Sequence, residues 1–464
     1  MLVISPFSTE DIVKATSGIL INGDMGVTFK GICTDTRLLE PEFLFFALKG
    51  RNFDGHTFWK EAIEKGAGGL VFHRIPEDLK LEELPQELSV ILVKDTIRAL
   101  GDLAQFFRVR ESFRVIAITG SCGKTTTKEL TYTLLSNFYR VRKNEANYNN
   151  LIGVPLSLLS FTDKPEWAIL EVGTSEKGEI GRLAEIVQPE ISLITCIYPA
   201  HLEGLGTLEG VLEEKVSLFE RTDPSGTIIY FYDQPLLRNR AQRFPQRKIS
   251  YGEDLGADLR LLGINSLPEG SKVLLEYEGK HYEWQVPLSG KHNILNLLGA
   301  LAIGVATGLA METLLETLSS VSPLLVRSKI YQLGDIILVD DTYNANPGSV
   351  TAALNWLSDV DMASGEKILI LGDMKELGEE APRYHREIGE LAGFVVDRAI
   401  FIGDMAEHYA EGYKSSGKSF NIYKRVEDFL EKATIPTKKA LVYIKGSRSL
   451  RMERIVEKLL KGMA

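Results

Sequence analysis

Short apolar runs, separated by polar or glycine-bearing segments, recur along the whole chain. In the first third they are Phe43–Leu48, Gly69–Phe72 and Val90–Val93, whose lengths are typical of buried β-strands. Segments of helical or turn character lie between them, including a turn-rich loop at residues 50–56. The pattern predicts a small α/β domain over residues 1–108.

The middle of the chain predicts a larger domain, from about residue 109 to residue 323. It opens with the apolar run Val115–Thr119, after which a glycine-bearing turn precedes a predicted helix from Thr127 to about Phe138. Further apolar runs are typical of a mostly parallel sheet with helical crossovers, and two later runs that flank a polar turn are typical of a hairpin. These runs are Trp167–Val172 and Ile191–Ile197 for the parallel sheet, and Val273–Tyr277 and Tyr282–Val286 for the hairpin.

The last third, residues 324–464, repeats one pattern. Each short apolar run ends in a polar or glycine-bearing turn, and the runs are Ile336–Val339, Ile368–Leu371, Ile400–Ile402 and Val442–Ile444. Doubly wound α/β folds bind ligands at such carboxyl strand ends. We therefore expect an α/β protein with a small N-terminal domain, a central P-loop-type ATPase domain and a Rossmann-like C-terminal domain.

Length and composition exclude several classes of protein. The chain has 464 residues, of which 44% are hydrophobic and 25% charged, enough for several packed domains. A net charge of -10 argues against a sequence-independent nucleic-acid binder. Three cysteines leave no even disulfide framework, the first residues lack a signal-peptide pattern, and no apolar run is long enough to span a membrane. We expect a cytoplasmic protein without an integral membrane segment.

The strongest local signal is a glycine-bearing loop between the predicted strand Val115–Thr119 and the helix after it. Glycines let backbone N–H groups approach phosphate oxygens, and a helix N-terminus adds favourable partial charge. Lys124 would reach the β- and γ-phosphates, and the Thr125 hydroxyl would bind Mg²⁺. Ile118 occupies the position of the first glycine of the full pattern, and the alternative is a turn that merely starts a helix. The predicted ATP-phosphate cradle is Gly120, Ser121, Cys122, Gly123, Lys124, Thr125 and Thr126.

Two residues at later strand ends are candidate ligands of the metal. Glu171 ends one predicted strand and His201 follows the next, so both side chains could lie at the edge that carries the glycine-bearing loop. Mg²⁺ prefers oxygen ligands, which makes Glu171 a natural candidate and His201 a less usual one. Taken alone, each residue is better explained by a structural role, and only their positions at successive strand ends put a functional role on an equal footing.

Together with Asn147–Asn150, Glu171–Gly173 and His201–Gly204, the glycine-bearing loop resembles the Mur ligases, which build the cell-wall peptide in the bacterial cytoplasm. The resemblance implies ATP and two Mg²⁺ ions, one held by Thr125 and Glu171 and the other by His201 and a carbamylated Lys215. It also implies catalytic roles for Lys124, His201 and Lys215. Without the resemblance, Lys215 would be interpreted as a solvated cation on a charged helix.

Motifs in the second half of the chain extend the resemblance. Gly290–Asn296 resembles the helix start that contacts adenine, through Asn293 and Asn296, although Asn293 could simply cap a helix. Asp340–Pro347, Leu371–Gly378 with His385, and Lys445–Arg448 resemble Mur ligases that take D-alanyl-D-alanine. In bare chemistry the pair Asp340-Asp341 could be only a turn. The resemblance implies ATP contacts by Arg327 and Asp341, and a peptide side formed by Asn149, Tyr343, Asn344 and Asn346.

The first domain is similar to the UDP-sugar-binding module of the same family. The similarity rests on Thr34–Arg37, Phe43–Leu48 and Asp54–His56. A guanidinium such as that of Arg37 can pair with a pyrophosphate. Ordinary loop and strand-cap chemistry is the alternative, and Thr36 stands where the family often has serine. The implied UDP-sugar contacts are Thr36, Arg37, Asn52, Asp54 and His56.

The resemblance implies an ATP-dependent ligation of D-alanyl-D-alanine to UDP-N-acetylmuramoyl-tripeptide through an acyl phosphate, by a monomer without a nucleic-acid partner. The third residue of the tripeptide is left open between lysine and meso-diaminopimelate. The third domain would close over the second about a hinge near residues 322–328. Alternatives are folylpolyglutamate synthase, which should lack the module at residues 34–56, a Mur ligase that adds the third residue, and a nucleotide-binding scaffold without catalysis.

Overall fold

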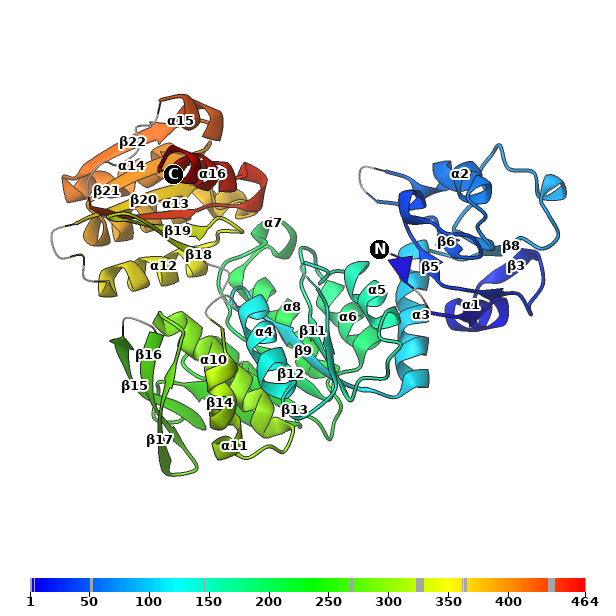
Figure 1. The fold of residues 1–464 in the computed structure, drawn as a ribbon, viewed down its shortest axis with the longest axis horizontal. Coiled ribbons are helices and arrows are strands. Elements are labelled where there is room, and N and C mark those ends of the chain that lie inside the picture. Colours follow the sequence, from blue (N-terminus) through cyan, green and yellow to red (C-terminus); the bar gives the residue numbers. More distant parts are fainter. Residues whose placement is uncertain are drawn as a thin grey trace.

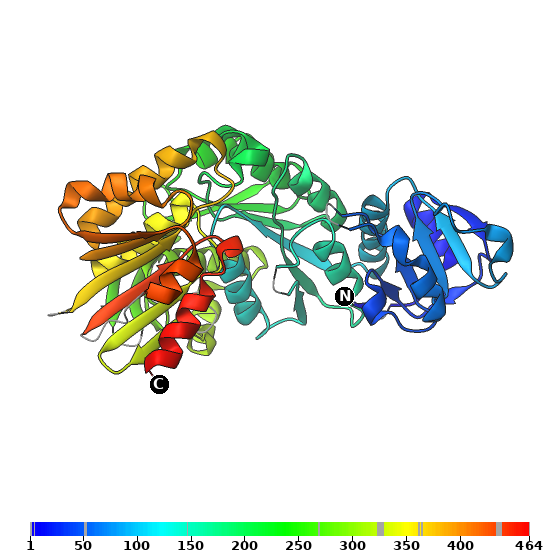
Figure 2. The same cartoon turned by 90° about the horizontal axis from the view of Figure 1, so that it is seen from above.

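In this computed structural model, three large β-sheets follow one another along the chain (Figure 1). Residues 2–3, 5–50, 53–145, 147–267, 270–322, 329–360, 362, 365–432 and 439–463 are described. Each large sheet forms a lobe of its own, and Figure 2 shows the N-terminal and C-terminal lobes at opposite ends of the molecule, with the middle lobe between them. The three-domain α/β fold predicted from the sequence is confirmed.

The N-terminal sheet has six strands in the order β1-β5-β6-β7-β8-β3, with β5 to β8 parallel and both edge strands antiparallel. The three strands predicted here are confirmed as β6, β7 and β8. β1, β3 and β5 were not predicted; β1 and β5 have only two residues each. The elements are β1 (Leu2–Val3), β2 (Phe7–Ser8), α1 (Thr9–Thr16), β3 (Ile19–Asn22), β4 (Thr28–Phe29), β5 (Ile32–Cys33), β6 (Leu44–Phe46), α2 (Trp59–Glu64), β7 (Gly69–Phe72) and β8 (Ser89–Leu92).

A long helix, α3 (Thr96–Glu111), joins the first lobe to the second. Asp95 caps its N-terminus by accepting a hydrogen bond from the Arg98 amide, and Ser112 ends it in the left-handed conformation, with φ 56°. One buried apolar cluster runs from the N-terminal lobe through this helix into the middle lobe, and it includes Ile12, Leu103, Leu158 and Leu183. The N-terminal and middle lobes are therefore packed together through one shared core.

The middle sheet has nine strands in the order β10-β11-β9-β12-β13-β14-β15-β16-β17, parallel from β10 to β15 and antiparallel in the terminal hairpin. The predicted parallel sheet and hairpin are confirmed. The strands are β9 (Arg114–Thr119), β10 (Val141–Lys143), β11 (Trp167–Glu171), β12 (Ile191–Ile194), β13 (Thr227–Phe231), β14 (Arg247–Gly252), β15 (Leu259–Leu267), β16 (Gly270–Tyr277) and β17 (Lys280–Val286). The helices are α4 (Lys124–Leu135), α5 (Gly153–Leu159), α6 (Glu179–Val187), α7 (Leu202–Leu205), α8 (Leu208–Glu220), α9 (Pro235–Ala241), α10 (Lys291–Ala306) and α11 (Met311–Glu316).

Two sequence predictions for this lobe had wrong boundaries. The helix predicted from Thr127 to Phe138 begins at Lys124 and ends at Leu135, because Gly123, with φ 82°, is its N-cap. The strand predicted to reach Ile197 ends at Ile194. The residues after it leave the sheet because they pack against the glycine-bearing loop, where the Cys196 carbonyl accepts from the Ser121 amide at 2.9 Å.

The C-terminal sheet has six strands in the order β18-β19-β23-β20-β21-β22, parallel except for β18 at one edge. All four predicted strands are confirmed; the edge strands β18 and β22 were not predicted. Two buried clusters cover its opposite faces. The elements are β18 (Lys329–Leu333), β19 (Ile336–Asp341), α12 (Pro347–Asp359), β20 (Glu366–Gly372), α13 (Ala381–Val395), β21 (Arg398–Ile402), α14 (Ala406–Tyr413), β22 (Ser419–Tyr423), α15 (Val426–Lys432), β23 (Ala440–Lys445) and α16 (Glu453–Met463).

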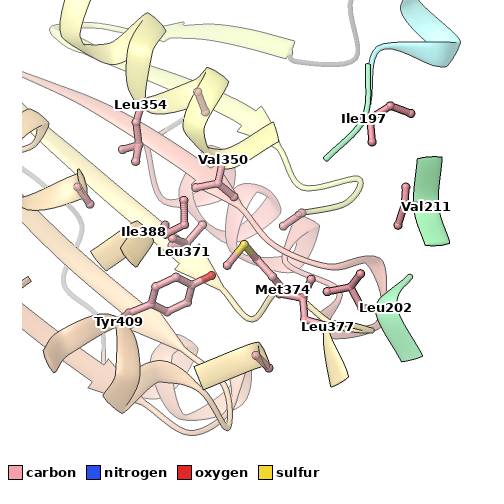
Figure 3. Close-up of a cluster of buried hydrophobic side chains, with 14 of the residues drawn as sticks. Ile197, Leu202, Val211, Val350, Leu354, Leu371, Met374, Leu377, Ile388 and Tyr409 are labelled. Carbon is pink, nitrogen blue, oxygen red and sulfur yellow. The ribbon is translucent and has the colours of Figure 1, made fainter. Parts of the chain in front are cut away.

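One of these clusters joins the middle and C-terminal lobes. Figure 3 shows Leu202 of α7 beside Leu377 and Met374, which follow β20. Ile197 and Val211 belong to the same cluster, so apolar side chains of both lobes are buried together. The predicted hinge at residues 322–328 lies almost wholly outside the described residues. No helix in the described ranges is long and apolar enough to cross a membrane.

Candidate active site

The glycine-bearing loop lies directly on neighbouring structure, and this makes two of its glycines necessary. Gly120 has φ 149°, and a Cβ there would lie 1.8 Å from the Thr195 hydroxyl oxygen. Gly123 has φ 82°, and a Cβ there would lie 2.4 Å from Oδ1 of Asn296. The Ser121 hydroxyl donates to the Tyr198 carbonyl at 2.8 Å. The first turn of α4 is thereby held with its backbone amides at the carboxyl edge of the sheet, where such amides bind phosphate.

A cavity of about 980 Å³ lies over this loop, between the middle and C-terminal lobes. Most of the predicted site residues line it, although they come from segments far apart in the chain. Gly120 does not line the cavity, and it packs closely against Thr195. The predicted residues that do are Ser121, Cys122, Gly123, Lys124, Thr125, Thr126, Asn149, Glu171, His201, Lys215, Asn293, Asn296, Asp341, Tyr343, Asn344 and Asn346.

Glu171 is the centre of a hydrogen-bonded group beside the loop. Its side chain is buried, and its two carboxylate oxygens accept from the Thr125 hydroxyl at 2.5 Å and from the Asn149 amide at 2.8 Å. Asn144, which was not predicted as a site residue, bonds the backbone N–H and C=O of Glu171, both at 2.9 Å. Lys128 in turn donates to the Asn144 carbonyl at 2.6 Å. The carboxylate is thus fixed in position from several sides.

The donors beside the loop suit a hard cation. Thr125 and Glu171 offer one hydroxyl and one carboxylate in contact, and Mg²⁺ is bound in proteins through few carboxylates, with phosphates and water completing its shell. No group of three or more His, Cys, Asp or Glu side chains in the described ranges is placed to share a metal ion. The residues present therefore fit Mg²⁺ bound together with a phosphate ligand, and do not form an all-protein metal cage.

Lys215 is buried, so its interpretation as a solvated cation is wrong. Its side chain lines the cavity from α8 with 2% exposure, and its ammonium makes no hydrogen bond or ion pair with the part of the chain that is described. Burial, together with the nearby charge of Lys124, lowers the pKa of Lys215 to about 7. Its neighbour Glu214 is also buried and accepts from the amides of Gly178 and Ile180, both at 2.7 Å.

His201 connects the two lobes that enclose the cavity. It has φ 55°, immediately before α7, and its Nδ1 is hydrogen-bonded to the Glu376 carboxylate of the C-terminal lobe. The bond to His201 lowers the pKa of Glu376. The Glu203 amide also donates to the Glu376 carbonyl at 3.3 Å. Glu376 was not a predicted site residue, although it lies within the motif Leu371–Gly378.

The C-terminal side of the cavity is built around Asp341 and a buried lysine. Oδ2 of Asp341 accepts from Lys445 at 2.6 Å and from the Tyr443 hydroxyl at 2.9 Å. Lys445 also donates to the Asn344 carbonyl at 2.9 Å. Asp340 lies in β19, and its side chain accepts from the amide and hydroxyl of Thr342 in the segment that follows the strand. The alternative that Asp340-Asp341 is only a turn is therefore wrong. Asp341 ends the strand, and its contact with Lys445 follows from the pairing of β19 with β23.

Asn346 reaches from the C-terminal lobe to the glycine-bearing loop. Its side-chain oxygen caps α12 by accepting from the Ser349 amide at 2.8 Å, while its side-chain nitrogen donates to the Ser121 carbonyl at 3.2 Å. One residue therefore determines where α12 begins and where the C-terminal lobe meets the loop.

The start of α10 forms another wall of the cavity. Its N-cap is Gly290, and Asn293 donates to the Ser289 carbonyl at 2.8 Å, so the alternative that Asn293 caps the helix is wrong. Burial lowers the pKa of His292 to about 4, which leaves the imidazole neutral at pH 7. Trp356 lines the same wall from α12, and a Cβ at Gly290 would lie 2.9 Å from its indole ring. His292 and Trp356 were not predicted as site residues.

Four of the predicted UDP-sugar contacts are described, and they do not line this cavity. Thr36 and Arg37 follow β5, and Asp54 and His56 follow β6, so they lie beyond the carboxyl ends of parallel strands in the N-terminal sheet. Arg37, 84% exposed, pairs with Asp35 at 2.6 Å, and Asp54 contacts the buried His56 at 2.7 Å and Arg74 at 2.9 Å. Arg74 was missed, although its place just after the predicted strand Gly69–Phe72 could have indicated it.

Three predicted ligand contacts remain: Thr36 and Asn52 for the UDP-sugar, and Arg327 for ATP. Thr36 is buried, and its carbonyl accepts from Lys65 at 2.7 Å. Asn52 and Arg327 lie outside the described residues, and their roles stay predictions.

The fold and the cavity together define a class: a three-domain α/β protein with a phosphate-binding loop in its middle domain and a C-terminal domain packed over the same cavity. Three family profiles match the chain: "Mur ligase family, catalytic domain" over residues 28–108, "Mur ligase middle domain" over 118–304, and "Mur ligase, glutamate ligase domain" over 326–448. The chain belongs to the Mur ligase family.

Relatives and solved structures within this family match almost the whole chain. UDP-N-acetylmuramoyl-tripeptide–D-alanyl-D-alanine ligase of Bacillus subtilis (strain 168) is 33% identical over 98% of this chain and 98% of its own. The structure of MurF from Acinetobacter baumannii has a TM-score of 0.88 at 29% identity, covering 99% of both chains. MurF ligase from Thermotoga maritima in complex with ADP has a TM-score of 0.81 at 27% identity, covering 93% of this chain and 97% of that one.

Proposed function

We propose that the chain uses ATP to join D-alanyl-D-alanine to UDP-N-acetylmuramoyl-tripeptide, giving the pentapeptide, ADP and phosphate. The observation that carries this proposal is the shared cavity, in which the phosphate-binding loop faces Tyr343, Asn344 and Asn346 of the C-terminal lobe. The substrates follow from the match with full-length relatives of that activity.

The reaction needs activation because a carboxylate is a poor acceptor for an amine. An oxygen of the tripeptide's terminal carboxylate attacks the γ-phosphorus of ATP, and ADP leaves. The amine of D-alanyl-D-alanine then attacks the acyl carbon, phosphate leaves with the bonding electron pair, and the nitrogen loses its proton to solvent. Phosphoryl transfer depends on positioning and charge neutralisation more than on covalent help from the protein.

The chain's own residues supply that positioning. The amides of residues 120–126 and the Lys124 ammonium hold the phosphates, and Lys124 is already bent over the loop, donating to the Gly120 carbonyl at 2.8 Å. Asn293 and Asn296 hold the nucleoside side with Arg327 and Asp341. Asn149, Tyr343, Asn344 and Asn346 hold the peptide side. Thr36, Arg37, Asn52, Asp54 and His56 bind the UDP-sugar in the N-terminal lobe.

The proposed reaction uses two Mg²⁺ ions bound in the cavity. Thr125 and Glu171 would hold one, and His201 and Lys215 the other. When bound, the ions supply positive charge that neutralises the phosphates and the acceptor carboxylate.

Lys215 takes part as a carbamate. Its unprotonated amine attacks the carbon of CO₂, a nitrogen–carbon bond forms as one carbon–oxygen π bond opens, and one proton leaves the nitrogen to solvent. A neutral amine thereby becomes an anionic carbamate, whose oxygens would serve as ligands. The attack requires an unprotonated amine, and the burial of Lys215 favours that form.

The domains of this ligase run over residues 1–108, 109–323 and 324–464, with a hinge near 322–328 about which the third closes. Their supports are the end of α3 at Glu111 and the contacts of Asn346 and Glu376 with the middle lobe. The protein acts as a cytoplasmic monomer. Folylpolyglutamate synthase is disfavoured because residues 28–108 match a Mur ligase profile, and the motifs at 340–347 and 371–378 disfavour a ligase that adds the third residue.

The decisive experiment measures phosphate release from ATP with UDP-N-acetylmuramoyl-tripeptide, with and without D-alanyl-D-alanine. Release that needs all three, with a pentapeptide product by mass, is expected; release with folate and glutamate instead would overturn the assignment. Lys124→Ala should abolish release without changing the melting temperature, whereas Lys424→Ala, at an exposed lysine of the C-terminal lobe, should leave release unchanged. Turnover by Lys124→Ala would exclude the proposed phosphate role.

A further inference from the structure

Two of the chain's three cysteines meet at the floor of the nucleotide cavity. Cys122 belongs to the phosphate-binding loop and Cys196 follows β12, 74 residues later, yet their sulfur atoms lie 3.1 Å apart. Both are free thiols, and both line the cavity. The third, Cys33, is buried in the N-terminal lobe. The ligation chemistry uses neither sulfur, so the pair requires its own explanation.

We propose that Cys122 and Cys196 are a redox modification site, at which a hydroperoxide converts the two thiols into a disulfide that impairs nucleotide binding by the phosphate-binding loop. The effect on nucleotide binding rests on the proposed function of that loop. Formation of the disulfide depends only on the geometry of the thiol pair.

Hydrogen bonds hold the two segments that carry the thiols side by side. The Ser121 amide donates to the Cys196 carbonyl at 2.9 Å, and the Thr195 hydroxyl donates to the Cys122 carbonyl at 2.5 Å. Because a disulfide has a sulfur–sulfur distance of about 2.05 Å, the two sulfurs need to approach by only about 1 Å. Neither cysteine lies in a strand, since β12 ends at Ile194, so this approach involves no residue of the sheet ladder.

The surroundings also favour reaction of these thiols. Thiolates are the reactive form, and positive charge nearby favours them. A hydrogen bond from the Cys122 thiol lowers the pKa of the Cys196 thiol to about 7, and the charge of Lys124 acts in the same direction. Both residues line the cavity, through which a small peroxide would reach the pair.

The peroxide is the only oxidant that formation of the disulfide requires. The Cys196 sulfur attacks one peroxide oxygen, the oxygen–oxygen bond breaks, and a sulfenic acid and water (for hydrogen peroxide) are formed. The Cys122 sulfur then attacks the sulfenyl sulfur, the disulfide bond forms, and a second water leaves. Two electrons pass from the sulfurs to the peroxide, and a dithiol reductant reverses the change.

The disulfide would act on nucleotide binding through the backbone of the loop. Cys122 lies among the residues whose amides face the phosphates, so a pull of about 1 Å on its side chain disturbs donors that must fit to within about 0.5 Å. Loss of one charge-assisted hydrogen bond weakens binding about tenfold. Conversely, bound nucleotide covers the thiols, so ADP should slow their oxidation.

The test exposes the reduced full-length protein to hydrogen peroxide, with and without ADP. We expect loss of two of the three thiols, a mass lower by two hydrogen atoms, at least about a tenfold loss of ADP affinity by calorimetry, and full recovery with dithiothreitol. Cys196→Ser should bind ADP and turn over normally when reduced, and should keep ADP affinity after peroxide. Cys33→Ser, the matched control, should respond as the wild type does.

Three outcomes would overturn the proposal. These are retention of all three thiols, a disulfide that leaves ADP affinity unchanged, and equal loss of affinity in the wild type and Cys196→Ser. Cys196→Ala serves the same comparison if the serine variant does not fold. Calorimetry and mass do not depend on ligation, so failure of the ligase assay with reduced protein would count against the proposed function and not against the thiol pair.

Discussion

Closure of the C-terminal lobe over the phosphate-binding loop depends on a glycine at the start of α12. Gly348 lies against the ring of Tyr198, and a Cβ at this position would lie 2.3 Å from the ring's Cγ, whereas ordinary contacts begin at 3.4 Å. The variant Gly348→Ala must therefore push α12 and the Tyr198 loop apart by about 1 Å. The same displacement lengthens the contact between Asn346 and the Ser121 carbonyl, now 3.2 Å.

The expected effect is on turnover and not on folding. A misplacement of about 1 Å can cost about 10²-fold in rate, which corresponds to about 2.7 kcal/mol in activation free energy. Alanine is also the better helix former, by up to about 1 kcal/mol, so the substitution does not weaken α12 itself. Gly348→Ala should therefore lower kcat about 100-fold while the melting temperature stays near that of the wild type.

A double-mutant cycle with Tyr198→Ala separates this clash from other effects. Phosphate release is measured at saturating substrates for the wild type, both single variants and the double variant. Once the ring is gone, Gly348→Ala should cause little further loss, so the two changes should couple by about 2 kcal/mol. The reasoning is refuted if Gly348→Ala turns over within twofold of the wild type, or if its loss is the same with and without the Tyr198 ring.

Three further predictions concern single side chains. Arg37→Ala should raise KM for the UDP-sugar substrate about tenfold and leave KM for ATP unchanged, whereas Arg383→Ala, at another exposed arginine, should change neither value. Asp373 is fully buried and accepts from Lys375 and two backbone amides, so Asp373→Ala should lower the free energy of unfolding of the C-terminal lobe in urea by about 3 kcal/mol; a loss under about 1 kcal/mol would contradict this. A hydrogen bond from Arg37 lowers the pKa of Asp35 from 3.8 to about 2, so the stability supplied by this exposed pair is present above pH 3.8 and is lost as the pH falls through 2. The difference in stability between the wild type and Asp35→Asn, at most about 1 kcal/mol, should vanish near pH 2, and a constant difference would count against the ion pair.

Strands buried on both faces could be predicted from the sequence, while edge strands could not. Residues 115–118 of β9 are completely buried, so an unbroken apolar run was enough to indicate a strand. In β22, Ser419–Tyr423, most side chains are exposed or half-buried, and its composition resembles that of a loop. Hydrogen bonding to β21 makes it a strand, and that pairing depends on the rest of the sheet.

The site was predictable where its residues are neighbours in the chain, or follow strands that could be identified. The loop at residues 120–126 and the strand-end Glu171 belong to this part. Glu376 and Lys445 lie in motifs that carry the resemblance, yet they were not assigned to the site, and neither was Trp356. Each matters through a partner on another element: His201, Asp341 and the start of α10.

By itself, the sequence determined the order of the three α/β domains and the position of the phosphate-binding loop, because apolar runs and closely spaced glycines act over a few residues. The tertiary structure alone decided the state of Lys215 and the contact of Cys122 with Cys196. Next to two glutamates in the chain, Lys215 has the pattern of a solvated cation. Packing of α8 removes it from water and lowers its pKa, and the sheet brings together thiols 74 residues apart. Desolvation and long-range contact depend on the packing of the whole domain, which local spacing does not encode.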